Sequence, residues 1–170
     1  MNKLIHLETE RTFMRQLVKE DSYNFYSLNL DEDVLKFTGD KPFSRIQDAI
    51  KFLENYDQYE KYRVGRLAVI DKGSLEFLGW CGLKYSVDRH EYDIGFRFFK
   101  KYWNKGYATE TSQRCLEYGF DELGIERIVG RARKENLASI QVMEKIGMTY
   151  LRAFDFDGHP GVIYHCSRKK

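Results

Sequence analysis

Several features that mark particular classes of protein are missing from this 170-residue sequence. No apolar run approaches the ~18 residues that a membrane-spanning helix needs. The first residues, MNKLIHLETERTF, mix charged with apolar side chains and do not resemble a secretory signal. The net charge is only +2, whereas a general nucleic-acid binder needs a basic excess or a basic face. We therefore expect neither a membrane protein nor a nucleic-acid-binding protein.

Cysteine, proline and the best-known ligand motifs are also scarce. The three cysteines, Cys81, Cys115 and Cys166, stand far apart without a Cys-x-x-Cys pair, which indicates reduced thiols and a cytoplasmic protein. The four histidines show no metal-ligand spacing, so we predict no metal site. No P-loop, no Gly-x-Gly-x-x-Gly dinucleotide motif and no Gly-x-Ser-x-Gly nucleophile elbow occurs.

The residues that are present suffice for one domain with a hydrophobic core, since 42% are hydrophobic and 15% aromatic. Alternating and apolar patterns predict strands over residues 6–17, 65–71, 76–86, 91–99, 125–133, 148–156 and 161–167. Helical spacing predicts helices over residues 21–28, 42–59, 107–120 and 136–147. Because strands cluster in the middle and a helix separates the later ones, we predict an α+β domain with one mixed sheet.

The stretch KKYWNKGYATE, residues 100–110, places one glycine between basic residues and the start of a helix. A helix N-terminus offers unpaired N–H groups and a partial positive charge, which suit a phosphate. Gly106 allows a close backbone approach, Ala108 and Thr109 keep the first turn uncrowded, and Lys105 adds a positive charge. On these residues alone, a phosphate cradle and a plain strand-to-helix turn both remain open.

A second stretch, residues 136–148, reads NLASIQVMEKIGM, with Asn136 at the position of a helix N-cap and Ser139 one turn later. Together, YWNKGYATE and ENLASIQVMEKIGM resemble the pyrophosphate loop and the following strand–helix segment of the GNAT superfamily of N-acyltransferases. The opening LETERTFMRQLVKEDS is similar to that of the RimJ/RimL-type branch, which acetylates protein N-termini. Trp103 is typical of this branch, since many other relatives have Gln or Arg there.

This resemblance covers nearly the whole chain and implies a single N-acetyltransferase domain over residues 1–170. It implies a strongly twisted mixed sheet of about six to seven strands, with helices on both faces, which splays apart where acyl-CoA lies. Acetyl-CoA is the implied co-substrate, and its acetyl group moves to a primary amine by direct attack through a tetrahedral intermediate. The residues implied to bind acetyl-CoA are Arg97, Phe98 and Phe99 along the pantetheine, the amides of Asn104, Lys105, Gly106, Tyr107, Ala108 and Thr109 at the pyrophosphate, Asn136 and Ser139 at the pantetheine end, and Lys145 at the nucleotide phosphate.

The resemblance also suggests catalytic residues. Asp93 matches a position where some members hold a carboxylate base, while Glu91 and Asp155 remain alternatives. Many relatives have a tyrosine that acts as the acid on the helix that follows the position of Asn136. In this chain Met143 occupies the position of that tyrosine. Ser139 is the implied substitute, as in the RimL-type pattern.

The acceptor stays open at this point. The branch favours a protein N-terminal α-amine, while a polyamine, an amino acid, an antibiotic amine and a non-catalytic acyl-CoA-binding role are alternatives on the same scaffold. The acidic residues Asp31, Glu32, Asp33 and Asp40 suit either a cationic substrate or a helix end. Relatives are often monomers or dimers, so a monomer or homodimer is expected.

Overall fold

A computed structural model describes residues 4–169 of the chain. Its strands are β1 (His6–Glu8), β2 (Thr12–Gln16), β3 (Arg66–Asp71), β4 (Phe77–Ser86), β5 (Glu91–Phe98), β6 (Arg127–Arg133), β7 (Thr149–Phe156) and β8 (His159–Ser167). Its α-helices are α1 (Ser22–Leu28), α2 (Glu32–Leu35), α3 (Ile46–Glu54), α4 (Gln58–Tyr62), α5 (Tyr107–Glu117) and α6 (Leu137–Lys145).

The strands form one mixed sheet in the order β1-β2-β3-β4-β5-β6-β8-β7, in which β5 and β6 pair in parallel and the other neighbours are antiparallel. This confirms the predicted α+β class. The strand number was wrong, because the described residues form eight strands rather than six to seven. The predicted strand over residues 6–17 is a hairpin of β1 and β2: Thr9 N donates to Thr12 O and Thr12 N donates to Thr9 Oγ1, which closes a tight turn.

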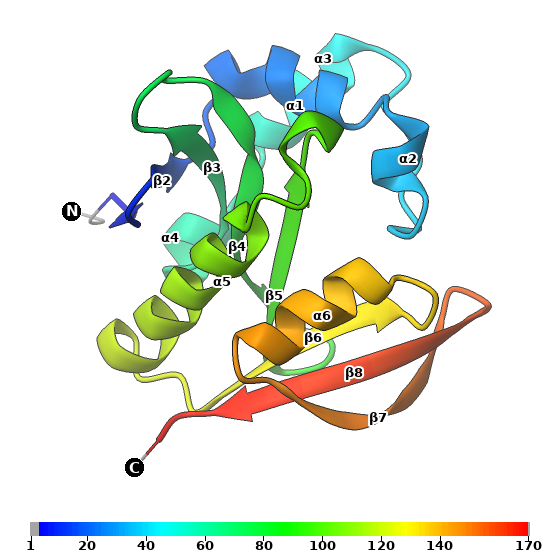
Figure 1. Cartoon of the computed structure of the whole chain (residues 1–170). Coiled ribbons are helices and arrows are strands. Elements are labelled where there is room, and N and C mark those ends of the chain that lie inside the picture. The colour runs from blue at the N-terminus through cyan, green and yellow to red at the C-terminus, as the bar shows by residue number, and fades with distance from the viewer. Residues whose placement is uncertain (1–3, 170) are drawn as a thin grey trace.

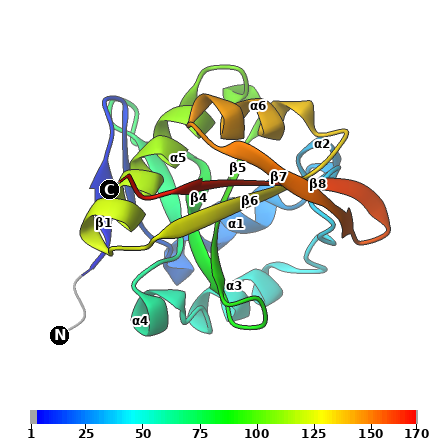
Figure 2. The same cartoon turned by 90° about the horizontal axis from the view of Figure 1, so that it is seen from below.

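Helices cover both faces of the sheet. In Figure 2, α5 and α6 lie on one side of the strands and α3 and α4 on the other. Strand β3 is buried on both faces, since Leu67 and Val69 join the core cluster that includes α5 and α6, whereas Ala68 and Ile70 join the cluster under α1 and α3. The sheet therefore separates two hydrophobic cores.

The helix predicted over residues 42–59 is interrupted. Its pieces are α3 and α4, and the Asn55 side chain donates to the Lys51 carbonyl at the break. This bond competes with continued helical pairing. The interruption turns Tyr56 and Tyr59 toward the start of β3, where both hydroxyls bind the backbone of Arg66.

The sheet splays apart between β5 and β6, as predicted. Their parallel pairing ends at Ile94 with Gly130, although β5 continues to Phe98 and β6 to Arg133. Figure 1 shows β6 diverging from β5 beyond this point, with α6 beside the gap. The unpaired backbone of both strands is the feature that positions the site.

Candidate active site

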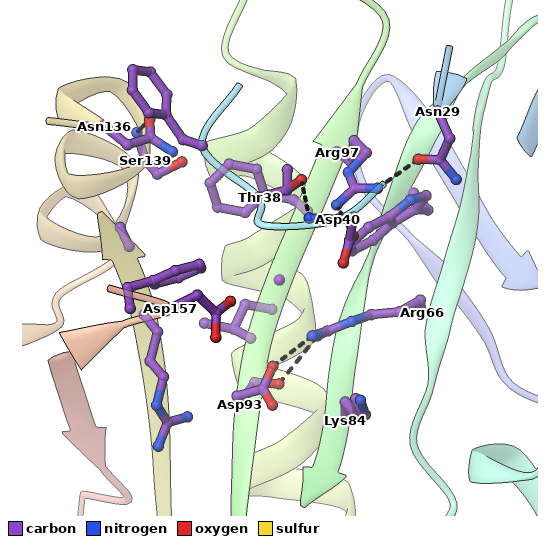
Figure 3. A pocket seen from close by; sticks show the side chains of 18 of the residues that line it. Asn29, Thr38, Asp40, Arg66, Lys84, Asp93, Arg97, Asn136, Ser139 and Asp157 are labelled. Atoms are coloured by element: carbon purple, nitrogen blue, oxygen red, sulfur yellow. Dashed lines mark hydrogen bonds and ion pairs between the residues drawn. The ribbon is translucent and has the colours of Figure 1, made fainter. Parts of the chain in front are cut away.

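The splayed strands open onto a cavity of about 630 Å³. Four of the predicted site residues, Asp93, Arg97, Asn136 and Ser139, line this cavity. They come from two elements far apart in the sequence: Asp93 and Arg97 from β5, Asn136 and Ser139 from the start of α6 (Figure 3). The structure thus brings the two predicted catalytic residues, Asp93 and Ser139, to one hollow.

The predicted pyrophosphate loop adopts the geometry of an anion-binding helix start. Gly106 is the N-cap residue of α5 with φ of 81°, a left-handed conformation that strains any side chain. The first intrahelical bond runs from Glu110 N to Gly106 O. The amides of Tyr107, Ala108 and Thr109 therefore have no partner within the helix and are directed toward its N-terminal end.

Arg11, which the sequence analysis missed, holds this loop in place. From the turn before β2, its Nη1 donates to the Lys105 carbonyl at 2.9 Å and its Nε donates to Glu110 Oε2 at 2.8 Å. Its guanidinium also lies 4.2 Å from the centre of the Tyr107 ring. No local pattern reports this contact, because Arg11 and Glu110 are 99 residues apart in the chain.

The edge of β5 that faces the gap has no strand partner beyond Ile94, where the pairing with β6 ends. The Phe99 amide donates to the Leu78 carbonyl, so it already has a partner on the β4 side. Backbone groups of successive strand residues point to opposite edges, which directs the Phe98 backbone toward the gap. The Phe98 carbonyl accepts a 2.8 Å hydrogen bond from the Trp103 indole, and the Phe98 N–H is available to a ligand. Trp103 thereby ties the end of β5 to the pyrophosphate loop.

The start of α6 faces the same gap. Asn136 is the N-cap that the pattern predicted, and its side-chain oxygen accepts from Ser139 N at 3.2 Å. Met143, in the position of the usual tyrosine, is buried and offers no acid. Ser139 Oγ has no hydrogen-bond partner among the described residues and lines the cavity. Lys145 is exposed at the other end of α6 and does not line the cavity.

Asp93 is bound by an arginine from two strands away. Arg66 Nη2 donates to Asp93 Oδ1 at 2.5 Å, and the two side chains are 17% and 20% exposed. The guanidinium reaches Asp93 by crossing Gly82 and Gly95, which are in register with it on β4 and β5. A Cβ on Gly95 would lie 2.8 Å from the guanidinium carbon, so a side chain there would displace the Arg66 guanidinium from this path.

Two tyrosines position Arg66 from behind. Tyr56 Oη accepts from Arg66 N at 2.9 Å, and Tyr59 Oη donates to Arg66 O at 2.5 Å. Burial raises the pKa of Tyr56, and burial raises that of Tyr59 further, so both remain protonated at neutral pH. The main chain of Arg66 is therefore fixed on both sides.

A second arginine, Arg97, is anchored in the same cavity wall. Its Nη1 donates to Asn29 Oδ1 at 2.5 Å and its Nη2 to Asp40 Oδ2 at 2.7 Å (Figure 3). The Trp80 ring lies between the two arginines, 5.4 Å from the Arg66 guanidinium carbon and 5.3 Å from that of Arg97. Each guanidinium is thus held by a cation–π contact as well as by its carboxylate.

The acidic residues near α2 serve structural roles. Asp31 caps α2 by accepting from Asp33 N, Asp33 pairs with Lys100, and Asp40 pairs with Arg97. Of these three, only Asp40 lines the cavity. The reading of these residues as a helix end therefore fits the structure better than an attraction for a cationic substrate.

The two alternative carboxylate bases also have partners. Glu91 forms an ion pair with Arg131, and both side chains are largely buried. Asp155 lines the cavity and accepts from Gly158 N at 3.1 Å in the β7–β8 turn. Asp93 is the candidate that lies on β5 beside the splay.

No cysteine lines the cavity. Burial raises the pKa of the Cys166 thiol to about 11, and the hydrogen bond with Cys81 together with burial raises that of Cys115. Burial acts to raise the pKa of Cys81 as well, but hydrogen bonds from Cys115 and Ser112 lower it overall. Since none of the three thiols lines the cavity, the geometry argues against an acetyl-cysteine intermediate. Within residues 4–169, no group of three or more His, Cys, Asp or Glu side chains is arranged to hold a metal ion. Across the same residues, no helix has both the length and the apolar character to cross a membrane.

Comparison with known proteins decides what this arrangement is. The acetyltransferase (GNAT) domain family matches residues 11–149. The chain belongs to the GNAT family. It is 34% identical over 146 residues to the uncharacterized N-acetyltransferase YnaD of Bacillus subtilis, covering 85% of this chain and 82% of YnaD. The uncharacterized protein YkkB of the same organism is 31% identical over 171 residues, 96% of each chain.

A solved structure agrees with these sequence relatives. The crystal structure of a GNAT-family acetyltransferase from Bacillus anthracis superposes with a TM-score of 0.84 at 28% identity, over 96% of this chain and 98% of that one. The chain is thus an acetyl-CoA-dependent N-acetyltransferase. The free amides at the start of α5 and the free Phe98 N–H fit acetyl-CoA, which carries phosphates and amide groups.

Proposed function

We propose that this GNAT N-acetyltransferase acetylates the α-amine of a protein N-terminus, as members of the RimJ/RimL-type branch do. The observation that carries the proposal is the ion pair between Arg66 and Asp93. Asp93 Oδ1 already accepts a hydrogen bond from Arg66, so only part of the carboxylate is left to receive a proton from the acceptor. The site therefore suits an amine that loses its proton readily.

The cost of deprotonation separates the two classes of acceptor. An α-amine with a pKa near ~8 needs about 1.4 kcal/mol to become neutral at pH 7. A lysine amine with a pKa near ~10.4 needs roughly 4.6 kcal/mol. The difference of about 3 kcal/mol favours the α-amine in a site whose base is already bound by an arginine.

We assign the chemical roles as follows. Asp93 accepts the amine proton through a water molecule, and backbone N–H groups of the splayed part of β5 around Phe98 stabilise the oxyanion of the tetrahedral intermediate. Ser139 protonates the departing thiolate, whose pKa near ~8.5 makes it a tolerable leaving group without strong acid assistance. Holding the amine and the thioester together supplies the larger share of the rate acceleration, up to ~7–11 kcal/mol of the activation barrier in favourable cases.

Acetyl-CoA binding is assigned to the predicted residues, with one refinement. The amides from Asn104 to Thr109 hold the pyrophosphate, Asn136 and Ser139 contact the pantetheine end, and Lys145 reaches the nucleotide phosphate. Among Arg97, Phe98 and Phe99, the Phe98 N–H makes the pantetheine contact, because the Phe99 amide is bound to Leu78. We further propose a cytoplasmic monomer or homodimer.

Fold neighbours do not choose the acceptor. They include a ribosomal-protein-S5-alanine acetyltransferase from Vibrio fischeri at 12% identity and a spermidine N-acetyltransferase from Vibrio cholerae at 18% identity. At such identities the likeness concerns the fold alone. Trp103 and Ser139 are the features that favour the RimJ/RimL-type branch.

The test is an acceptor screen that measures release of free coenzyme A. The panel contains a peptide with a free N-terminus and an internal lysine, the same peptide with a blocked N-terminus, and spermidine. We expect turnover with the first peptide and none with the blocked one. Turnover with spermidine alone, or with the blocked peptide through its lysine, would refute the α-amine acceptor.

A further inference from the structure

Three arginines from separate elements lie near one another, and two of them, Arg89 and Arg131, line the cavity. Arg131 lies on β6, Arg89 in the turn between β4 and β5, and Arg152 on β7. Arg131 and Arg152 are both in register with Ile163 of β8, which places them on either side of it on the same face. Both Arg89 and Arg152 lie close enough for their charges to act on Arg131. We call these three residues the arginine rim.

A bulge contributes to this arrangement. The pairing of β7 with β8 shifts register between Tyr150 and Arg152. Bulges of this kind re-aim a side chain and often occur beside active sites. The shift allows Arg152 to share the face of Arg131.

The protein does not neutralise the rim. Glu91 pairs with Arg131, but among the described residues neither Arg89 nor Arg152 forms an ion pair. Asp88, exposed beside Arg89 in the same turn, pairs with no member of the rim. Three positive charges around one carboxylate repel one another and attract an anion.

Arg131 has donors to spare for such an anion. Its side chain makes one hydrogen bond to the protein, from Nη2 to Glu91 Oε1. None of its nitrogen atoms is among the fully buried polar atoms without a partner, so its other N–H groups keep some contact with solvent, although the side chain is only 13% exposed. Arg131 also lines the cavity together with Arg89. An arginine fork with free donors matches a carboxylate or phosphate.

The arginine rim lies about two strand residues from Asp93, the residue proposed to receive the proton of the reacting amine. The Arg131 guanidinium pairs with Glu91, the first residue of β5, whereas Asp93 stands two residues further on the same face. Two strand residues span about 6.6 Å. An extended peptide advances at most ~3.3–3.6 Å per residue, so its second or third side chain reaches the rim when its amine is beside Asp93.

We propose, building on the proposed function, that the acceptor carries an anionic group one or two residues from its reacting amine and that the arginine rim binds this group. The acceptor is accordingly an N-terminus with an acidic second or third residue. The same rim repels a polyamine, which has no anionic group to offer.

The experiment measures kcat/KM by coenzyme A release at saturating acetyl-CoA. Its substrates are three peptides that differ only at positions 2 and 3, as Glu-Glu, Gln-Gln or Lys-Lys, with free glutamate and spermidine as further arms. We expect the Glu-Glu peptide to exceed the Gln-Gln peptide by about tenfold, the effect of one charge-assisted contact. Higher salt should reduce the ratio.

Charge-reversal variants locate the effect. Arg89→Glu and Arg152→Glu, made separately at exposed positions, should each lower the Glu-Glu to Gln-Gln ratio several-fold. Lys51→Glu carries the same change of charge on exposed α3, outside the cavity lining, and should leave the ratio unchanged. Equal rates for the three peptides, or a ratio that Lys51→Glu alters as much, would overturn the anion site while the α-amine acceptor stands.

Other outcomes bear on the proposed function instead. Turnover of spermidine with no peptide turnover would refute both proposals. Turnover of free glutamate without peptide turnover, sensitive to Arg152→Glu, would uphold the anion site and refute the protein acceptor.

Discussion

The carboxylate of Asp93 is held by the guanidinium of Arg66, with 2.5 Å between Oδ1 and Nη2. Arg66 begins β3 and reaches β5 by passing over β4. Gly82 on β4 and Gly95 on β5 lie in register with it. The α-amine acceptor proposed above rests on this pair.

Removing the arginine should destabilise the fold. In Arg66→Met, the Asp93 carboxylate loses its partner at a site where the two side chains are only 17% and 20% exposed. We expect a loss of about 3 kcal/mol in the free energy of unfolding, measured by urea denaturation. The double variant Arg66→Met/Asp93→Asn should recover part of this loss. Strictly additive losses would show that the two residues are not coupled.

Removing the carboxylate should mainly affect turnover. Asp93→Asn should lower kcat/KM for an α-amine peptide by roughly 10²-fold or more at pH 7, the usual range for a general base. The deficit should shrink toward pH 9, because an amine with a pKa near ~8 then deprotonates in solution. A deficit that stays constant between pH 7 and 9 would assign Asp93 a purely structural role.

Gly106 should be essential for acetyl-CoA binding. In the wild-type protein, a hundredfold excess of acetyl-CoA over its dissociation constant should stabilise the native state by about 2.7 kcal/mol, seen as a thermal shift. Gly106→Glu should abolish this shift, since its side chain and negative charge would meet the pyrophosphate.

Gly147 offers a matched control. It has φ of 86°, close to the 81° of Gly106, and open space around it. Gly147→Glu therefore imposes the same kind of backbone strain away from the loop. Retention of the shift in Gly147→Glu separates ligand binding from strain, whereas its loss in both variants would contradict the assignment of the loop.

The ion pair between Arg11 and Glu110 should make the stability of the protein depend on pH in the acidic range. Burial acts to raise the pKa of Glu110, but hydrogen bonds from Thr9 and Arg11 outweigh it and lower that pKa overall. The ionised Glu110 therefore stabilises the folded state fully at pH values above its unfolded-state pKa near ~4.3. This stabilisation is lost as the pH falls through the lower pKa that Glu110 has in the folded state.

The variant Arg11→Ala tests this linkage. We expect it to lower the free energy of unfolding by about 1 kcal/mol at pH 7, a modest value because Arg11 is 40% exposed. The gap between variant and wild type should narrow by pH 3, measured by thermal unfolding. A gap that widens on acidification would have the wrong sign for this pair.

The sequence predicted helices and strands correctly where one hydrophobic periodicity continued along the whole element. The strands over residues 91–99 and 125–133 and the helix beginning at residue 136 occur close to their predicted places. The failures lie where a side chain bonds to nearby backbone. Thr9 closes a turn inside the predicted first strand, and Asn55 interrupts the predicted long helix. Such bonds are local, but their strength depends on neighbours that periodicity does not report.

The candidate site divides in the same way. Gly106, Asn136 and Ser139 belong to short motifs whose chemistry is written in consecutive residues, because a helix start needs only its own amides and cap. No short sequence motif identifies Arg11, Arg66 or Trp80 as a site residue. Each acts on a residue in another element, and only the packed sheet brings them together.

Amino-acid order alone was sufficient for the α+β class, the helix-start loop and the family, since these depend on spacing within short segments. The tertiary structure decided which charges are free. It placed Arg66 on Asp93 and Asp40 on Arg97, and it left the arginine rim without a matching set of carboxylates. Ion pairing depends on distances of a few ångströms between distant segments, and a linear sequence does not contain those distances.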